Sequence, residues 1–277
     1  MIAASSVSIL LGTPVAQSGV TPAYLQSVLA FSRLCADLGW HVDIRTREDG
    51  LVTRSRNIFG SQMVHSERYT HLLMVDSDLG FEPEVPQRLV DSGHDLVGAC
   101  VPLREVRWQK VRAALDQVGS LTPEEMESLG HLYAVSFVRP SSDAGGVTPV
   151  GDFVPARFVG GAMMLARREV FVRLAGSDEV THYEQGGNWQ DWDPSGWTFF
   201  DQLVDPETGT YLSEDYAFCH RWRAVGGKLW ADVRSQVTHH GNLSVRGDVA
   251  QTLRTAGKVA KARHNGVDSQ SRVSTSD

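Results

Sequence analysis

Apolar and polar residues in the N-terminal part of the chain follow two alternating patterns. Short, uninterrupted apolar runs predict strands, and segments with apolar residues at every third or fourth position predict helices. The predicted strands cover residues 7–11, 40–45, 72–75 and 96–99. The predicted helices between them cover residues 22–38, 54–65 and 83–90. This alternation predicts an α/β fold with a Rossmann-like, mostly parallel sheet that is flanked by helices.

The first helix has the clearest boundaries of these elements. Thr21 suits the N-cap, Pro22 suits the first helical position, and Gly39 suits the C-terminal end. Between the first strand and this helix, the segment Gly12-Thr13-Pro14 is expected to form a turn.

The pattern in the rest of the chain is less regular. Residues 103–152 have the character of an insertion, with a surface helix at 123–129 and a turn rich in Gly, Ser and Asp at 141–146. Beyond them, strands are predicted at 157–166, 228–231 and 236–241, and helices at 167–174 and 213–225. Ser213 is expected to cap the last of these helices, which Gly226-Gly227 ends.

Residues 182–200 combine aromatic rings with hydrogen-bonding side chains. The aromatic residues are Tyr183, Trp189, Trp192, Trp197, Phe199 and Phe200. Such a segment is typical of a platform on which a sugar or a base stacks. A satellite hydrophobic cluster beneath a long loop has the same composition, and the sequence leaves both interpretations open.

Composition narrows the class of protein only modestly. The chain has 277 residues, of which 42% are hydrophobic and 21% charged, and this suits a soluble protein with a sizeable core. The net charge of −7 does not favour tight binding to nucleic acid. The 3 cysteines contain no C-x-x-C pair, so we expect neither a disulfide framework nor a zinc site. Residues 1–20 lack the basic start of a signal peptide, and no apolar run is long enough to span a membrane, so we expect a cytoplasmic protein without a membrane partner.

The segment with the clearest chemical meaning is 71–78, an apolar run that ends in Asp76-Ser77-Asp78. In open α/β sheets, ligands bind beyond the carboxyl ends of the strands, where these carboxylates lie. Side chains two residues apart point to the same side of an extended backbone, and paired oxygen ligands suit Mg²⁺ or Mn²⁺. A turn or helix cap is the competing interpretation of a strand-end Asp. An EF-hand loop is excluded, because Gly80 comes one position early and the fifth loop position supplies no oxygen.

Several segments, in their order along the chain, resemble motifs of one enzyme family. Asp76-Ser77-Asp78 after a buried strand resembles the D-x-D motif of nucleotide-sugar-dependent glycosyltransferases with the GT-A fold, of a family 2-like type. Residues 211–222 (YLSEDYAFCHRW) resemble the SEDxxFCxRW helix of bacterial and phage members, and 226–230 and 238–241 follow in the expected order. The resemblance covers residues 5–245 and is more specific for the fold and the donor class than for the acceptor.

The resemblance implies how the chain is divided. A single GT-A-like domain is expected over residues 1–245, followed by a C-terminal helix and flexible tail at 246–277. The parts of the domain are a nucleotide-binding half at 1–102, an insertion at 103–152 and an acceptor or catalytic half at 153–245. Disorder is expected after His264, where the chain becomes polar and rich in Ser.

The resemblance also implies a metal site. Asp78 is expected to be the main ligand of Mn²⁺ or Mg²⁺, and Asp76 to contact the nucleotide ribose or the same metal through water. His239 is expected to be the third metal-site ligand, and His240 could exchange roles with it. A surface histidine that only forms hydrogen bonds is the competing interpretation of either one.

A second group of residues is implied to lie near the nucleotide sugar. Gly12-Thr13-Pro14 resembles a loop against the base, Arg54, Arg56 and Asn57 resemble an RxRN segment near the nucleotide, and Gly160-Gly161 resembles a segment close to the transferred sugar. Arginine suits phosphate recognition, although both arginines could be ordinary charges on a helix surface.

Glu214 and Asp215 match a Glu-Asp pair of the family, in which one carboxylate of inverting members is the general base on the acceptor hydroxyl. Asp215 is the first choice for this role and Glu214 the second. A helix N-terminus favours the ionised carboxylate that a base requires. Acids that merely stabilise the first turn of the helix are the competing interpretation.

These observations predict a metal-dependent glycosyltransferase that moves a sugar from a nucleotide sugar, UDP in particular, to an acceptor hydroxyl. The acceptor is expected to be a saccharide or a hydroxymethylated base in phage DNA, and the sequence leaves the sugar and the stereochemistry open. A nucleotidyltransferase of related fold is one alternative, which the absence of a basic residue between Gly12 and Arg33 disfavours. A non-catalytic carbohydrate-binding protein, using the aromatic segment, is the other.

Overall fold

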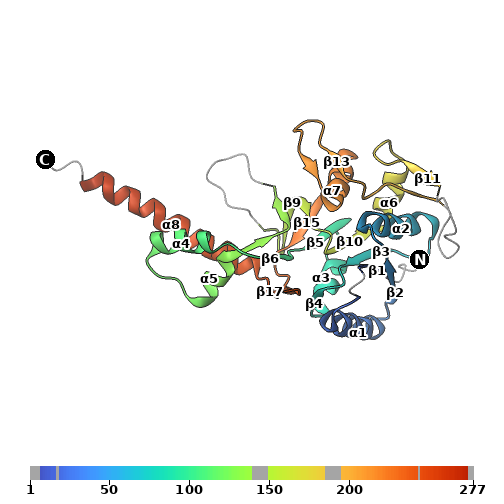
Figure 1. Ribbon diagram of the computed structural model, residues 1–277, viewed down its shortest axis with the longest axis horizontal. Helices are drawn as coiled ribbons and strands as arrows, with labels where there is room; N and C mark the ends of the chain where they lie inside the picture. Colours follow the sequence, from blue (N-terminus) through green and yellow to red (C-terminus); the bar gives the residue numbers. More distant parts are fainter. Residues whose placement is uncertain (1–6, 17–18, 139–148, 185–194, 243, 274–277) are drawn as a thin grey trace, which may run out of the picture.

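The computed structural model of the chain describes residues 7–16, 19–138, 149–184, 195–242 and 244–273 (Figure 1). Its centre is an eight-stranded sheet with the order β2-β1-β3-β10-β5-β15-β9-β8. The strands of this sheet are β1 (Ser8–Val15), β2 (His41–Glu48), β3 (His71–Val75), β5 (Leu96–Ala99), β8 (Val135–Phe137), β9 (Phe153–Val159), β10 (Met163–Arg167) and β15 (Leu229–Asp232).

The strand directions make this sheet mostly parallel. β1 pairs in parallel with β2 and with β3, and β15 pairs in parallel with β5. β10 runs antiparallel between β3 and β5, and β9 runs antiparallel between β15 and β8. Only β9 and β10 therefore oppose the other strands of this sheet, and the predicted α/β class with a mostly parallel sheet is confirmed.

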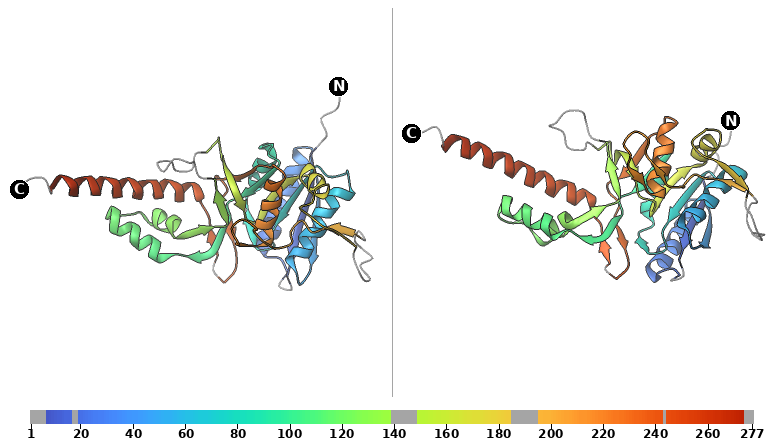
Figure 2. Two further views of the ribbon diagram at one scale, coloured as in Figure 1. Left: turned by 90° about the horizontal axis from the view of Figure 1, so that it is seen from above. Right: turned by 45° about the horizontal axis from the view of Figure 1, so that its top comes forward.

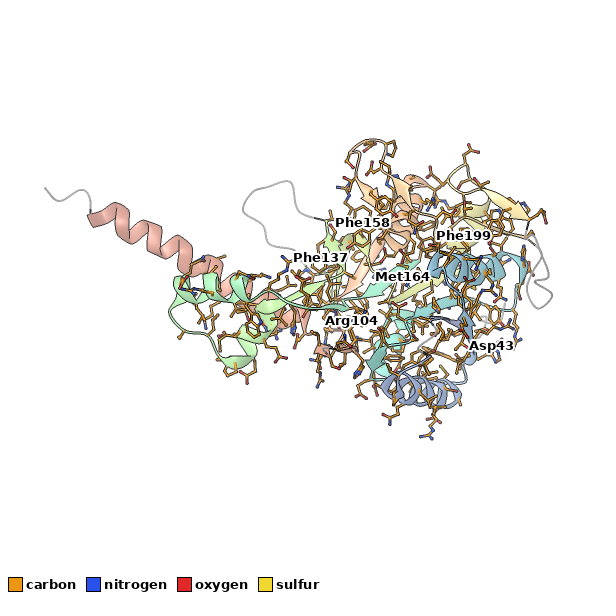
Figure 3. The ribbon with its side chains drawn as sticks, in the orientation of Figure 1. Asp43, Arg104, Phe137, Phe158, Met164 and Phe199 are labelled. Carbon is orange, nitrogen blue, oxygen red and sulfur yellow. The ribbon has the colours of Figure 1, made fainter. Side chains whose placement is uncertain are left out.

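Helices cover both faces of the sheet, which explains why its strands are apolar on both sides. Phe59 of α2 (Val52–His65), Phe171 of α6 (Arg168–Ala175) and Phe218 of α7 (Glu214–Ala224) belong to the hydrophobic core on one face. Phe31 of α1 (Pro22–Asp37) and Leu89 of α3 (Glu84–Asp91) belong to the core on the other. Figure 3 shows the side chains that fill this body.

Four small sheets accompany the central sheet in the described residues. β4 (Leu79–Phe81) pairs antiparallel with β16 (Val237–His239), which pairs with β17 (Val245–Arg246). β6 (Pro102–Val106) pairs with β7 (His131–Tyr133) across a register shift. Two hairpin-like pairs complete the strands: β11 (His182–Glu184) with β12 (Ser195–Trp197), and β13 (Leu203–Val204) with β14 (Tyr211–Leu212).

Three helices project from this body as an arm. They are α4 (Trp108–Val118), α5 (Pro123–Gly130) and α8 (Val249–Val273), and Figure 2 shows them extending together in both further views. Val111, Ala114 and Leu129 form the small core between them, and Val259 packs against it. Thr122 and Glu125 form a reciprocal capping box at the start of α5, which confirms the helix predicted there.

The structure corrects three local predictions. Gly12-Thr13-Pro14 does not form a turn, because β1 continues to Val15 and stays paired with β2 along this length. The strand predicted over 157–166 is two strands, β9 and β10, separated by residues 160–162 and paired with different partners. Helix α8 continues to Val273, past the start of the predicted disordered tail.

The structure confirms both predicted ends of the first helix. The Thr21 side chain accepts a hydrogen bond from the backbone N–H of Tyr24, and Gly39 adopts a positive φ of 69° just after α1. The turn predicted at 141–146 lies outside the described residues. Among the described helices, none combines the length and the apolar character that crossing a membrane requires.

The core on the α2–α6–α7 face is expected to dominate stability. Phe171→Ala should lower the free energy of unfolding by about 3–5 kcal/mol, because it leaves a cavity among rings that are fully buried. The neighbouring Val172 is 40% exposed, so Val172→Ala is the matched control and should change it by less than about 0.5 kcal/mol. Urea denaturation of both variants measures the difference, and equal effects would contradict this assignment of the core.

Candidate functional site

The two aspartates after β3 lie in a turn and do not continue the strand. β3 ends at Val75, and the backbone N–H of Leu79 donates to the carbonyl of Asp76 at 3.3 Å. The Asp76 N–H donates to the carbonyl of Ala162 at 2.8 Å, which ties it to the segment between β9 and β10. The premise that an extended backbone points both carboxylates to one side is therefore wrong, and Asp76 and Asp78 have different partners.

Asp76 belongs to a cluster that is organised by a buried arginine. The Arg56 side chain, from α2, is only 3% exposed. Its Nη2 donates to Oδ1 of Asp76 at 2.9 Å, and its Nη1 donates to Oε1 of Glu214 at 2.7 Å. Burial alone would lower the pKa of Arg56, but the nearby carboxylates of Asp76, Glu214 and Asp215 outweigh it and raise this pKa. The guanidinium is thus charged and joins the end of β3 to the start of α7.

Asp215 joins the same cluster through backbone contacts. Its Oδ2 accepts a hydrogen bond from the N–H of Gly161 at 2.9 Å, and its Oδ1 accepts from the N–H of Tyr216 at 2.8 Å. Ser213 occupies the N-cap position, but its hydroxyl donates to Asp215 Oδ1 at 2.5 Å. It accepts no hydrogen bond from the helix backbone, so the predicted side-chain cap is wrong. The pair Glu214-Asp215 therefore lies against the Gly160-Gly161 segment.

Neighbouring side chains leave no room for a Cβ atom at either glycine of that segment. A Cβ atom on Gly161 would lie 2.1 Å from Nη1 of Arg56, and one on Gly160 would lie 2.7 Å from the Cβ of Ala134. Either contact would force its neighbour to move. The resemblance placed Gly160 and Gly161 near the transferred sugar, and the structure places them beside the Arg56 and Asp215 side chains.

Asp78 forms a second cluster with a histidine and an arginine. Its Oδ1 lies 3.4 Å from Nε2 of His239, and its Oδ2 accepts a hydrogen bond from Nη1 of Arg104 at 2.9 Å. Nδ1 of His239 lies 2.9 Å from the carbonyl oxygen of Pro102. The antiparallel pairing of β16 with β4 creates this contact, because it sets His239 opposite Leu79, the residue after Asp78.

The contacts in this cluster lower the pKa of Asp78 and raise the pKa of His239. Burial alone would raise the pKa of Asp78, but the hydrogen bond with His239 and the positive charges of His239 and Arg104 lower it. Burial alone would lower the pKa of His239, but its contacts with Asp78 and with the Pro102 carbonyl raise it. The neighbouring Arg104 acts against that rise.

The alternative histidine takes another position. The backbone N–H of His240 donates to the carbonyl of Asp78 at 2.9 Å, so its main chain supports the turn. A Cβ atom on Gly80 would lie 2.9 Å from its Nε2, and its Nδ1 lies 3.3 Å from the hydroxyl of Ser244. The contact with the Asp78 carboxylate is made by His239.

Four residues that were predicted to bind the nucleotide have other contacts in the structure. A Cβ on Gly12 would meet the Phe59 ring at 2.8 Å, and the Thr13 hydroxyl lies 2.5 Å from that of Tyr24. Asn57 donates to Asp201 and accepts from the N–H of Phe200, both at 2.7 Å, and Arg54 is paired with Asp49 at 2.5 Å. For these residues, and for Pro14, contact with a nucleotide stays a prediction.

The aromatic segment divides between core and surface. Phe199 and Phe200 are fully buried in the α2–α6–α7 core, so they are part of the main core and not of a satellite cluster. Trp197 is partly buried and its ring lies 5.2 Å from that of His65 and 5.0 Å from that of His182. Trp189 and Trp192 lie outside the described residues, so the stacking interpretation is not tested by them.

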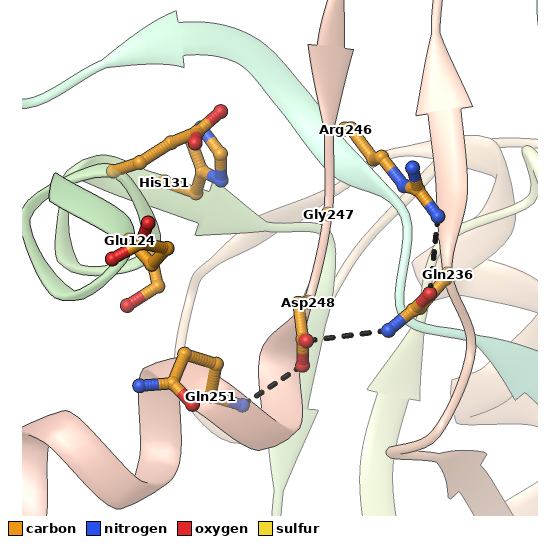
Figure 4. Close-up of a pocket in the computed structure, with 9 residues that line it drawn as sticks. Glu124, His131, Gln236, Arg246, Gly247, Asp248 and Gln251 are labelled. Carbon is orange, nitrogen blue, oxygen red and sulfur yellow. Dashed lines mark hydrogen bonds between the residues drawn. The ribbon is translucent and has the colours of Figure 1, made fainter.

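A pocket of about 240 Å³ lies where the arm joins the body (Figure 4). His131 and Glu124 line one side, and Asp248 lines the other, where it accepts hydrogen bonds from the side chain of Gln236 and the backbone of Gln251. None of the residues predicted to be catalytic, donor-binding or metal-binding lines this pocket. The candidate site therefore rests on the contacts of the two carboxylate clusters and not on this hollow.

Of the known proteins compared with this chain, only solved structures gave matches. No family model and no curated protein matches it. Among solved structures, A197 from STIV has a TM-score of 0.43 at 12% identity, over 85% of this chain and 87% of that one. GalNAc-T7 with UDP, GalNAc and Mn²⁺ has a TM-score of 0.38 at 11% identity, over 92% of this chain but only 48% of that one.

A third similar structure is 4-diphosphocytidyl-2C-methyl-D-erythritol synthase from Anaerococcus prevotii DSM 20548. Its TM-score is 0.31 at 9% identity, over 62% of this chain and 78% of that one. At such scores the likeness carries no argument about function. The fold class given above rests on the order and direction of the strands in this chain.

The titration of His239 tests the second cluster directly. In the metal-free protein, the pKa of His239 should lie above its ordinary value, Asp78→Asn should lower it, and Arg104→Gln should raise it. The stability that its protonation contributes is present below about pH 6.5 and is lost as the pH rises through the raised pKa. Nuclear magnetic resonance of the imidazole nitrogens measures this pKa, and a value that Asp78→Asn leaves unchanged would contradict the contact.

Proposed function

We propose that the protein is a metal-dependent glycosyltransferase of GT-A type, which moves a sugar from a nucleoside diphosphate sugar, UDP-linked in particular, to an acceptor hydroxyl. The observation that supports this most is the convergence of segments that are distant in sequence. Asp78 meets His239, and Arg56 joins Asp76 to Glu214, around the carboxyl end of β3. Ligands of open α/β sheets bind at that end of the strands.

The donor set at Asp78 and His239 fits Mn²⁺ or Mg²⁺. The Pro102 carbonyl can accept a hydrogen only from a protonated Nδ1, so a neutral His239 presents the lone pair of Nε2 toward Asp78. Metal-binding histidines commonly hold their second nitrogen in this way. The described residues contain no group of three His, Cys, Asp or Glu side chains that could hold an ion. Mg²⁺ and Mn²⁺ sites need fewer, because water and substrate phosphates complete them.

The other residues have roles that follow from their contacts. The bound ion would supply stabilisation of the charge that develops on the departing diphosphate. Arg56 holds Asp76 and Glu214 at fixed positions, since breaking a buried ion pair costs about 3–5 kcal/mol. Asp215 holds the backbone of Gly161. One of the two acids of α7 takes the proton of the acceptor hydroxyl, with Asp215 as the first candidate and Glu214 as the second.

The acceptor in this proposal is a hydroxyl of a saccharide, with a hydroxymethylated base of phage DNA as the second choice. A net charge of −7 disfavours tight contact with a DNA duplex. The aromatic residues before α7 would suit either a sugar ring or an extruded base, because both stack on aromatic side chains.

Calorimetry with nucleoside diphosphates tests the metal and donor parts of the proposal. The protein should bind UDP in the presence of Mn²⁺ and lose at least about tenfold in affinity when EDTA removes the ion, since the ion links the phosphates to Asp78 and His239. Asp78→Asn and His239→Ala should each abolish this Mn²⁺ dependence. Asp37→Asn, on the exposed end of α1, changes the charge equally and should not. If no nucleoside diphosphate binds with Mn²⁺, the proposal is wrong.

The two acids of α7 can be separated by rate measurements. Loss of the general base should reduce kcat for sugar transfer by roughly 10²–10⁴-fold while the affinity for UDP changes little. Asp215→Asn is expected to show this loss, and Glu214→Gln to show it if the roles are reversed. Glu169→Gln is the matched control, because Glu169 is an exposed first-turn acid of α6. Equal, small effects in all three variants would mean that the acids only stabilise their helices.

A further inference from the structure

We infer that Arg104 is a positioning residue for the diphosphate of the donor, and that it exchanges Asp78 for a phosphate when the donor binds. This inference rests on the proposed function. Arg104 lies on β6, within the segment that the sequence indicated to be an insertion, and Figure 3 places it where the arm joins the body. No sequence motif singled it out.

Arg104 lies beside the candidate metal ligands. Nη1 of Arg104 donates to Oδ2 of Asp78 at 2.9 Å and to the carbonyl of His240 at 3.1 Å. Strand β6 also supplies Pro102, whose carbonyl orients His239. Strand β6 thus presents a positive charge to Asp78 and an orienting carbonyl to His239. A phosphate that joined an ion on Asp78 and His239 would lie next to this guanidinium.

The guanidinium of Arg104 has N–H donors that its contacts with the described residues leave available. Arginine has five N–H donors in a planar fork, and the fork matches phosphate oxygens two at a time. Nη1 carries both hydrogen bonds of Arg104, so Nε and Nη2 form none with any residue that the structure describes. The nearby Glu105 does not compete for them, because it is paired with Arg107. These N–H groups can therefore donate to two oxygens of a phosphate, and Nη1 releases Asp78 in the exchange.

The side chain of Arg104 is held less firmly than that of Arg56. Its side chain is 47% exposed, whereas that of Arg56 is 3% exposed. An exposed ion pair is worth little and can be exchanged, while a buried one is held firmly. A Cβ atom on Gly241 would lie 2.8 Å from Cδ of Arg104, so glycine at this position leaves room for the arginine stem. Arg56 is thus suited to a fixed role and Arg104 to an exchangeable one.

The exchange also resolves a conflict of charge. Without an ion, Arg104 compensates the carboxylate of Asp78. A divalent cation on Asp78 would repel the guanidinium, and the negative diphosphate would attract both. The arginine therefore competes weakly with the cation alone and assists it when the diphosphate is present.

Calorimetry on the full chain with UDP, UMP, uridine and Mn²⁺ as probes tests this inference. With saturating Mn²⁺, Arg104→Gln should weaken UDP binding about ten- to a hundredfold, weaken UMP binding less and leave uridine unchanged, because a charge-assisted contact to the phosphates is lost. Without nucleotide, the same variant should bind Mn²⁺ as tightly as the wild type or more tightly. Arg112→Gln, an exposed arginine of α4, is the matched control and should change none of these.

The outcomes separate this inference from the proposed function. If the wild type binds UDP with Mn²⁺ and Arg104→Gln loses no more than Arg112→Gln, the role of Arg104 is wrong and the proposed function stands. An equal loss for UDP and uridine would also overturn it, because that pattern indicates a change in the nucleoside site or the fold. Weaker Mn²⁺ binding without nucleotide would overturn the exchange. If the wild type binds no UDP with Mn²⁺, both proposals fail.

Discussion

The shared guanidinium of Arg56 is the interaction on which the candidate site depends. A charged side chain that is only 3% exposed needs partners of opposite charge. Asp76, after β3, and Glu214, at the start of α7, are these partners. The bridge fixes the distance between the end of β3 and the start of α7. Gly161 permits it, because any side chain there would collide with the guanidinium. Together with the hydrogen bond from Gly161 to Asp215, this bridge relates the acids of α7 to the aspartates after β3.

The sheet decides which side chains can meet. β3 lies between β1 and β10, and the antiparallel β10 returns the chain so that residues 160–162 lie beside Asp76. The pairing of β16 with β4 then brings His239 to Asp78. Two clusters result, one around the buried side chain of Arg56 and one around Asp78, where the Arg104 side chain is 47% exposed. A buried arginine such as Arg56 suits a positioning role, and an exposed one such as Arg104 suits an exchange of ligands.

Much of this arrangement could be predicted from local patterns, and part of it could not. β3 and the cap at Thr21 follow from apolar runs and capping chemistry, which act within a few residues. Gly12 was misjudged as part of a turn, because its need for space comes from the distant Phe59 ring. No motif or periodicity in the sequence indicated a role for Arg104. Its position depends on how the segment after β5 folds back across β16, and no periodicity records such long-range contacts.

The proposed function requires that Asp78 and His239 bind one divalent cation that also binds the donor diphosphate. Anomalous X-ray scattering from crystals of the full chain soaked with Mn²⁺ and UDP tests it most directly. We expect a manganese peak coordinated by the Asp78 carboxylate, by Nε2 of His239 and by the phosphates. A peak elsewhere, such as among the acids of the pocket in Figure 4, with Asp78 still bound to Arg104, would contradict it.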